Sequence, residues 1–396
     1  MSEFGSKEVI FNDTTSNIKS TFIHQTEDSE SISSNKSGNE DENWRKVLNL
    51  CHQTNPIPFG LEFPSKAFDN LEPIDTGSYS LVSKGFDKRI QKEVVFKIIN
   101  VVSSKTTKKL FGVTFDGKQL LSDVFNEIMV SKCLSNLHIT TVDYMGHQYL
   151  SHTFPRIVST RLVQGCIPNY LRLKPTNDSM ERLEKIEMSR ETPGTPREYL
   201  VITMKNCGQP LWKLIYQKSV TANQLLSVCY QLTLALAVAE CLFEFEHRDL
   251  HIANVLLKKT KKKSIKFVVK TKTYYIQSFG IKAYIIDTTF SRMKIGENVF
   301  FTSLTSRLNG LLGHKSPDLQ EWVYIRMAEE AKDDWHKWNP QTNLFWLRYF
   351  YRTVQISSMV DKNKDIKPKQ KLTKLLNKIT EYKTLDQFIK YIEFDF

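Results

Sequence analysis

Several features that would assign this chain of 396 residues to a particular class of protein are missing from it. Its six cysteines form no Cys-x-x-Cys pair and have no histidine at a metal-ligand spacing, so neither a zinc site nor a disulfide framework is predicted. Cys133, Cys229 and Cys241 lie in apolar stretches with helical spacing, where a thiol behaves as a small hydrophobic group. A reducing compartment is the simplest inference. No hydrophobic segment at the amino terminus indicates secretion.

Charged residues are missing from residues 219–239, a stretch of 21 positions. That length is close to what a helix needs to cross a bilayer. The stretch nevertheless contains polar residues such as Thr221, Asn223 and Gln231, and it leads directly to the polar segment that begins at His247. We therefore expect a helix buried in the core of the protein and no membrane span.

Apolar clusters and basic residues are both scarce in residues 1–43, which hold nine acidic residues and three lysines, a net charge of −6. Such a composition cannot bury enough apolar surface to fold, so this segment is predicted to be a disordered tail. Because the whole chain carries +12, residues 44–396 carry +18. An excess of this size favours association with nucleic acid or another polyanion, although many basic proteins bind neither.

Acidic residues are also missing between Lys258 and Lys272, a segment that holds eight lysines. Val268, Val269 and the residues that follow have strand character, so residues 258–276 are predicted to form a basic hairpin. Three interpretations remain open: a solvated hairpin, a contact with DNA or chromatin, and a nuclear-import signal.

The most specific pattern that is present lies at residues 247–254, which read H-R-D-L-H-I-A-N and are followed by Asp287, 38 residues after Asp249. It matches the H-R-D-L-x-x-x-N pattern of protein kinases at every fixed position. In that pattern the aspartate accepts the proton of an attacking hydroxyl, while the asparagine and a later aspartate hold magnesium on the nucleotide phosphates. Asp249 is therefore the predicted catalytic base, and Asn254 and Asp287 are the predicted metal ligands. All three are also counted among the residues predicted to bind the nucleotide. An incidental polar loop is the alternative.

A lysine interrupts the β-branched and aromatic run of residues 94–99, which read V-V-F-K-I-I. Such a run is typical of a buried strand, and a lysine there is costly to bury unless it is paired. In the kinase pattern this lysine contacts the α- and β-phosphates of ATP, so Lys97 is the predicted counterpart. A lysine on an edge strand that points to water is the alternative.

Residues 120–134 have apolar side chains at helical intervals, and Ser122 is a candidate for the cap of the predicted helix. Glu127 lies among otherwise apolar neighbours in this segment. We predict that Glu127 pairs with Lys97. An ordinary exposed glutamate is the alternative.

A loop that covers the nucleotide is expected before the strand lysine, and residues 74–82 are the best candidate. Compared with G-x-G-x-x-G-x-V, they keep Gly77 and Val82 and have Asp75 and Ser80 at the other glycine positions. Ile74, Asp75, Gly77 and Val82 are the predicted nucleotide contacts. Asp75 adds a negative charge near an anionic ligand, and an ordinary hairpin explains the segment equally well.

Together these motifs resemble those of the haspin-type protein kinases. That family has D-Y-T in place of D-F-G, followed by a short Ser-Arg, and it lacks an A-P-E motif. Residues 285–292 read I-I-D-T-T-F-S-R, with Thr288 at the tyrosine position, and no A-P-E occurs in the sequence. Further matching stretches lie at residues 236–240, 245–246, 254–260, 335–340 and 343–347. The similarity covers residues 45–396 and is greatest around residues 225–292.

The resemblance implies a two-lobed protein-kinase fold of the α+β class, with a small, mainly antiparallel β lobe that carries a key helix and a larger, mainly helical lobe. The predicted division is a tail at residues 1–43, an amino-terminal lobe at residues 44–205 and a carboxy-terminal lobe at residues 206–396. ATP and magnesium are the implied cofactors. At the hinge, Lys205, Cys207 and Gly208 would contact the nucleotide, and Pro210 stands where the family tends to have an acid for the ribose.

The family also implies phosphorylation of a threonine near the start of the histone-three tail in mitosis, in the nucleus and on chromosomes. A monomer is expected. Where family members carry a carboxylate-rich segment, residues 302–310 have no acid and an added arginine, Arg307, and Thr76 replaces a carboxylate of the glycine loop. Without those charges, the selection of a basic peptide loses its evident source. The aspartate usual in the first buried helix after the activation segment is not evident either, and Glu321 is the nearest candidate.

Two accounts of the function follow from these observations. In the first, Lys97, Glu127, Asp249, Asn254 and Asp287 form the complete set of an active kinase that phosphorylates a serine or threonine. In the second, a degraded nucleotide site belongs to a non-catalytic module that binds chromatin through its basic surface. The intact metal ligands favour the first account, because a retired site has no physical need for both Asn254 and Asp287.

Overall fold

The computed structural model of the protein describes residues 38–76, 80–102, 119–171, 197–308, 310–311, 317–358 and 366–394. Most of the predicted disordered tail lies outside the described residues, and so does Gly77 of the predicted nucleotide loop. Residues 43–396 form one compact unit, which contains every described residue of the predicted site. The predicted boundary between lobes at residues 205 and 206 stays a prediction.

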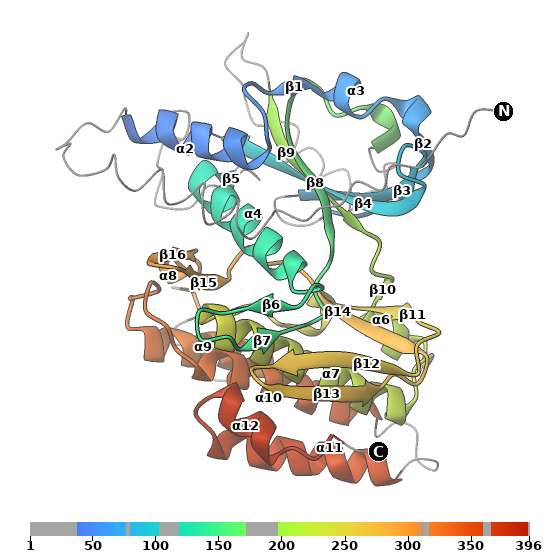
Figure 1. The fold of residues 1–396 in the computed structure, drawn as a ribbon, viewed down its shortest axis with the longest axis vertical. Coiled ribbons are helices and arrows are strands. Elements are labelled where there is room, and N and C mark those ends of the chain that lie inside the picture. The colour runs from blue at the N-terminus through green and yellow to red at the C-terminus, as the bar shows by residue number, and fades with distance from the viewer. Residues whose placement is uncertain are drawn as a thin grey trace. The chain divides into compact units, whose positions relative to one another are not determined.

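A mainly antiparallel sheet forms one part of this unit (Figure 1). Its seven strands in the described residues follow the order β1-β8-β9-β4-β3-β2, with β5 paired to β4. Only the β1–β8 and β4–β5 pairs of this sheet are parallel in the described part of the chain. The strands are β1 (Ile57–Pro58), β2 (Phe68–Thr76), β3 (Ser80–Asp87), β4 (Lys92–Val102), β5 (Gln119–Leu120), β8 (Ile157–Gln164) and β9 (Glu198–Lys205).

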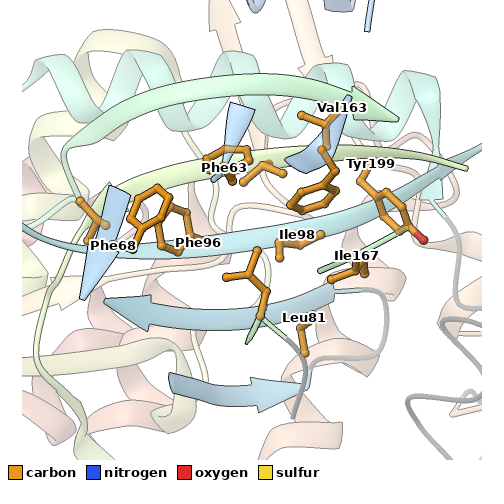
Figure 2. Packing of buried hydrophobic residues seen from close by; sticks show 12 residues of the cluster. Phe63, Phe68, Leu81, Phe96, Ile98, Val163, Ile167 and Tyr199 are labelled. Carbon is orange, nitrogen blue, oxygen red and sulfur yellow. The ribbon is translucent and has the colours of Figure 1, made fainter. Parts of the chain in front are cut away.

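The side chains of β4 alternate between two apolar clusters, because successive residues of a strand point to opposite faces of a sheet. Phe96 and Ile98 belong to the cluster that Figure 2 shows, which also contains Phe63 and Tyr199. Ile99 belongs to a second cluster, on the other face. Lys97 lies between Phe96 and Ile98 in the sequence, so its side chain emerges on the face of the second cluster.

Helix α4 (Leu121–Asn136) packs on that second face and buries Val124 and Ile128 against Ile99. Val47 of α2 (Gly38–Leu50) joins the same cluster. The predicted helix at residues 120–134 is thus confirmed. The proposed cap is wrong, because α4 begins at Leu121 and Ser122 lies inside its first turn. Short helical segments complete this part of the unit: α3 (Phe59–Glu62), η1 (Ser65–Ala67) and η3 (Asn169–Leu171).

The other part of the unit is mainly helical and is built around α7 (Ala222–Phe243), in which residues 225–240 are all buried. The helix begins with a capping box in which Thr221 and Gln224 bond to each other's backbone N–H groups. Among the described residues, α7 alone has the length and apolar character of a membrane span, and 89% of that stretch is buried inside the protein. This agrees with the core helix predicted from the sequence.

Further helices accompany α7 in this part of the unit (Figure 1). They are α6 (Leu211–Tyr216), α8 (Thr305–Leu308), α9 (Leu319–Ala331), α10 (Gln341–Ser358), α11 (Ile366–Lys378) and α12 (Leu385–Tyr391), with the short segments η4 (Ile252–Asn254) and η5 (Ile379–Glu381). Trp346 and Phe350 of α10 are fully buried. The mixture of helices with a mainly antiparallel sheet confirms the α+β class.

Within the described ranges, four small sheets accompany the helices. They pair β10 (Gln209–Pro210), β11 (Val255–Lys259) and β14 (Ile281–Ile285); β12 (Ser264–Val269) and β13 (Lys272–Gln277); β15 (Arg292–Ile295) and β16 (Asn298–Phe301); and β6 (Thr141–Val142) and β7 (Gln148–Tyr149). The predicted basic hairpin is therefore present as β12–β13. Its predicted start is wrong, because Lys258 and Lys259 belong to β11, in a different sheet.

Candidate active site

The segment at residues 247–254 connects α7 to β11, and Asn343 of α10 fixes its start. The backbone N–H of His247 donates to Asn343 Oδ1 at 3.1 Å, and Asn343 Nδ2 donates to the carbonyl oxygen of Phe245 at 2.7 Å. Asn343 also donates to the buried carboxylate of Glu240 at 3.0 Å. Sequence reasoning missed this role, because nothing local marks an asparagine 96 positions away as the support of a loop.

Glu321 is the nearest candidate in the sequence for the aspartate usual in the first buried helix after the activation segment, and in the structure it caps a helix. It forms a capping box with Asp318 at the start of α9: the Asp318 carboxylate accepts from the N–H of Glu321 at 2.8 Å, and the Glu321 carboxylate accepts from the N–H of Asp318 at 3.1 Å. Asn343, in contrast, bonds directly to the start of the 247–254 segment and to Phe245, which precedes it.

Lys97 meets two carboxylates that lie far from it in the sequence. Its Nζ atom is 2.5 Å from Glu127 Oε1 and 3.3 Å from Asp287 Oδ1. The predicted pairing with Glu127 is thus present, and Glu127 is buried on α4. β4 directs Lys97 toward α4, so the alternative of a lysine pointing to water is wrong.

These contacts determine the charge states of the cluster. Burial opposes the positive charge of Lys97, but the carboxylates of Asp287 and Glu127 outweigh it and raise the pKa of the lysine. Burial likewise opposes the negative charge of Asp287, but the Lys97 ammonium and the hydrogen bonds of Thr289 hold the pKa of that carboxyl well below its usual range. Both groups are therefore charged near neutral pH.

Two threonines that follow Asp287 tie it to α4. Thr289 Oγ1 lies 2.6 Å from Asp287 Oδ1, 3.1 Å from Glu127 Oε2 and 3.4 Å from the Lys97 ammonium. The Thr288 hydroxyl lies 2.8 Å from Ser131 Oγ of α4. The resemblance identified Thr288 only as a variant of the usual tyrosine, and Thr289 was not assigned a role in the sequence.

Asp249 lies beside this cluster and is held by three groups. Tyr324 of α9 donates its phenol proton to Asp249 Oδ1 in a short hydrogen bond. Asn254 Nδ2 donates to the backbone oxygen of Asp249 at 2.9 Å and lies 3.4 Å from Oδ2, and His251 Nε2 is 3.7 Å from Oδ1. Burial raises the pKa of Asp249 to about 7, and the charge of nearby Asp287 adds to that effect, while the hydrogen bonds of Tyr324 and Asn254 oppose it.

The donor atoms of Asn254 and Asp287 fit a magnesium ion. Asn254 directs its Nδ2 atom toward Asp249 and His251, so its Oδ1 atom faces away from them. Asp287 uses Oδ1 for Lys97 and Thr289, and its Oδ2 atom makes no hydrogen bond within the described part of the chain. No cluster of three or more His, Cys, Asp or Glu side chains suited to a metal occurs among the described residues. Magnesium needs no such cluster, since one or two carboxylates suffice when phosphate and water complete its shell.

The backbone at two of these positions is unusual. Arg248 and Asp287 have φ angles of 63° and 64°, the left-handed region that non-glycine residues rarely adopt. Such conformations persist where the surroundings enforce them, and they concentrate at functional sites. At Arg248 the surroundings include Glu246, which accepts two hydrogen bonds from the guanidinium, and the Trp335 ring at 5.4 Å.

The predicted nucleotide loop lies on the β2–β3 hairpin, next to Lys97. Val82 of β3 is directly opposite Lys97 of β4, and Asp75 of β2 is opposite Val82. Ile74 also belongs to β2 and is 46% exposed. The described part of the loop is therefore an antiparallel hairpin whose turn, with Gly77, lies outside the described residues.

The predicted hinge contacts lie where β9 ends and β10 begins. Lys205 is the last residue of β9, and Cys207 is buried and donates its thiol to the Lys205 carbonyl at 3.2 Å. Gly208 has a φ of 98° and lies against β11, so that a Cβ atom there would be 2.0 Å from the carbonyl oxygen of Leu257. Pro210 precedes α6 as its N-cap residue and offers no acid for a ribose.

Comparison with known proteins agrees with this geometry. Residues 12–395 match the model of the haspin-like kinase domain. A Drosophila melanogaster serine/threonine-protein kinase haspin homolog is 28% identical over 309 residues, which cover 76% of this chain and 51% of the relative. Serine/threonine-protein kinase haspin of Mus musculus is 28% identical over 77% of this chain and 38% of its own length. An Arabidopsis thaliana haspin homolog is 31% identical over 48% of this chain and 31% of its own length. The chain thus spans about half of the length of the first of these relatives and less than half of the other two.

Proposed function

Because this chain belongs to the family of haspin-like kinases, we propose that it is an ATP-dependent serine/threonine protein kinase. The observation that carries this proposal is the contact of Lys97 with both Glu127 and Asp287, beside Asp249 and Asn254. A non-catalytic module has no need to keep this set of charges together, because each buried charge costs free energy unless it is paired.

The roles of the residues follow from their chemistry. Lys97, held by Glu127, would grip the inner phosphates of ATP, and Asn254 and Asp287 would hold magnesium. When bound, magnesium neutralises the charge that develops on the phosphates. Asp249 would orient the serine or threonine hydroxyl and accept its proton as the bond to phosphorus forms. The hairpin β2–β3 and the hinge at Lys205, Cys207 and Gly208 would enclose the nucleotide between two lobes.

The proposed acceptor is a threonine of a histone tail, phosphorylated in mitosis by a monomeric, nuclear, chromosome-associated protein. This part rests on the family alone. Residues 302–310 offer a cation and no acid: the guanidinium of Arg307 lies 4.7 Å from the Phe290 ring, and its charge opposes the rise in the pKa of Asp249. A peptide with fewer basic residues around its acceptor is therefore a specific alternative to the histone tail.

The test is a phosphorylation assay with purified protein, magnesium and labelled ATP. The acceptors are a peptide of the histone-three amino-terminal tail, its threonine-to-alanine variant, and a peptide with acidic residues in place of its arginines and lysines. Label on the threonine peptide alone supports the histone substrate, and label on the acidic peptide supports a different substrate. The Asp249→Asn variant should bind ATP and fold normally but transfer at least about 100-fold less phosphate. Equal turnover by the variant would overturn the assignment of the base.

We also propose that the hairpin β12–β13 and the lysines before it contact DNA in chromatin. The support is a row of exposed lysines with no acid between them: Lys259, Lys261, Lys262, Lys263, Lys266 and Lys272. Such contacts weaken steeply with salt because they release counterions. Replacing Lys261, Lys262 and Lys263 by Gln should weaken binding to duplex DNA and make the salt dependence shallower. Unchanged binding would favour the solvated hairpin.

A further inference from the structure

One contact of Asp249, the candidate base, involves a residue that takes part in neither phosphate binding, metal binding nor proton transfer. Tyr324 lies on α9, 75 residues after Asp249 in the sequence, and its phenol donates to Asp249 Oδ1. The other two groups that hold this carboxylate, His251 and Asn254, belong to the same loop as Asp249. Among the hydrogen bonds that the Asp249 carboxylate accepts within the described residues, that of Tyr324 is thus the one that comes from a separate element.

The phenol is held in place by its surroundings. The Tyr324 ring meets the Trp346 ring edge to face, with centroids 5.2 Å apart. Trp346 is itself fully buried, and its indole N–H donates to Met327 Sδ, one turn along α9, at 3.2 Å. The capping box of Asp318 and Glu321 fixes the start of the same helix. Packing on these sides limits the rotamers of Tyr324, so its hydroxyl is presented to Asp249 at little entropic cost.

The phenol of Tyr324 does not occupy every hydrogen-bond acceptor position of the Asp249 carboxylate. An ionised carboxylate has about four acceptor positions, two on each oxygen. Tyr324 takes one on Oδ1, and the amide of Asn254 makes only a long contact with Oδ2 at 3.4 Å. Acceptor positions therefore remain for an incoming hydroxyl. A neutral phenol donates its proton and does not compete with Asp249 for the proton of the substrate.

We infer that Tyr324 is a positioning residue for phosphoryl transfer: its phenol holds the carboxylate of Asp249 in one orientation, so that the free acceptor positions face the substrate hydroxyl. This inference rests on the proposed kinase function. Precise orientation of a reacting group contributes strongly to rate, and small displacements reduce it. Loss of the phenol leaves Asp249 in place but frees its carboxylate to rotate.

The test is the Tyr324→Phe variant of the full chain, which keeps the ring against Trp346. Its kcat for the most rapidly phosphorylated peptide of the assay above should fall about ten-fold. The KM for ATP should stay unchanged, because Tyr324 bonds to Asp249 and makes no hydrogen bond to Lys97, Asn254 or Asp287, the residues assigned to the phosphates and the metal. Tyr351→Phe is the matched control: its phenol is also hydrogen-bonded, but to Thr233 of α7, and it is fully buried. This control should lose similar stability and keep its kcat.

Each other outcome would overturn the inference. An unchanged kcat in Tyr324→Phe would mean that the phenol only packs, and a higher kcat would mean that it competes with the substrate hydroxyl. A fall in kcat that is matched by Tyr351→Phe, or accompanied by an equal rise in the KM for ATP, would indicate a general structural effect. If the wild-type protein phosphorylates no peptide, the proposed function itself fails, which is a separate result.

Discussion

At the scale of single residues, Thr289 connects the three charged groups of the site. Its hydroxyl lies within 3.4 Å of Asp287, Glu127 and Lys97, and it has only one proton to donate. Thr289→Ala should leave the Lys97–Glu127 pair intact but remove a hydrogen bond to Asp287, at a cost of about 1 to 2 kcal/mol in unfolding free energy. Peptide phosphorylation should fall several-fold because the Asp287 carboxylate is less fixed.

Thr289→Ser is the matched control, since it keeps the hydroxyl and loses only the methyl group. Chemical denaturation and kcat/KM for a peptide, measured on both variants, check the prediction. Equal losses in the alanine and serine variants would mean that the methyl group, not the hydroxyl, matters at this position.

The titration of His247 makes the stability of the folded protein depend on pH. Its Nε2 atom is 3.1 Å from the Ile286 carbonyl, and its Nδ1 atom accepts from the N–H of Asp249 at 3.3 Å, an arrangement that requires the neutral ring. Burial lowers the pKa of His247 from 6.5 to about 4. The unfolded chain therefore binds a proton that the folded chain excludes, so stability is present above pH 6.5 and is lost as the pH falls toward 4.

Between pH 8 and pH 5 this one group should cost about 2 kcal/mol of unfolding free energy. Denaturant unfolding at the two pH values measures the loss in the wild type and in His247→Gln, which cannot titrate in this range. The difference between the two pH values should be smaller in the variant by about that amount. An identical pH dependence in both proteins would contradict the assignment.

At the scale of elements, the hinge depends on the close approach of Gly208 to β11. Gly208→Ala should destabilise the protein by more than about 2 kcal/mol, because it combines a positive φ with a Cβ placed 2.0 Å from the Leu257 carbonyl oxygen. Gly280→Ala is the control: its φ is 79°, but nothing lies within 4 Å of its added Cβ. Gly280→Ala should lose only the stability that an alanine with a positive φ costs.

Thermal unfolding and ATP affinity check this pair of variants. Gly208→Ala should reduce both the thermal stability and the ATP affinity. The hinge must move away from β11 to relieve the overlap between the added Cβ atom and the Leu257 carbonyl oxygen. The alanine at position 280 should reduce stability slightly and leave ATP affinity unchanged. Equal stability losses would show that the contact with Leu257 is relieved without cost.

The elements themselves were predictable where periodicity or composition carries the signal. The β-branched and aromatic run predicts the strand at Lys97, helical spacing predicts α4, and the uncharged stretch predicts the core helix α7. The capping of α4 was predicted wrongly, because the sequence does not reveal that the helix begins at Leu121. The basic hairpin was predicted too long, since which strand Lys258 pairs with depends on tertiary structure.

Within the site, the residues of the kinase pattern were predictable because their spacing in the sequence is specific. Asn343, Tyr324 and Thr289 were not, because each acts through a contact over a long sequence distance or through a hydroxyl that no motif marks. A side chain that supports another residue can be replaced by one from a different element. Such roles therefore leave no fixed spacing to detect.

At the scale of the whole molecule, the segment after Asp287 is held by contacts that need no modification. Thr302 Oγ1 donates to the Thr289 carbonyl at 2.7 Å, and Asn126 Nδ2 of α4 donates to the Phe301 carbonyl at 2.6 Å. The strands β15 and β16 pair in between. Many kinases order this segment by phosphorylation, through new pairs between arginine and phosphate.

The arginine of the H-R-D motif is not available for such a pair in this protein. Arg248 is only 2% exposed, donates two hydrogen bonds to Glu246 and stacks on Trp335. Glu246 in turn accepts from the N–H of Asn339 at 2.8 Å, so the pair is tied to the segment that precedes α10. A phosphate would have to break this buried pair, which costs roughly 3 to 5 kcal/mol when one partner is lost.

We therefore expect kinase activity that does not depend on phosphorylation of the chain. Protein treated with a phosphatase, and shown by mass spectrometry to be unmodified, should keep its kcat within about two-fold, because Arg248 is already paired with Glu246. Glu246→Gln should instead lose stability and activity together, since it leaves the Arg248 charge buried without a carboxylate. A loss of activity on phosphatase treatment that ATP and time restore would contradict this expectation, and it would mean that Arg248 exchanges Glu246 for a phosphate.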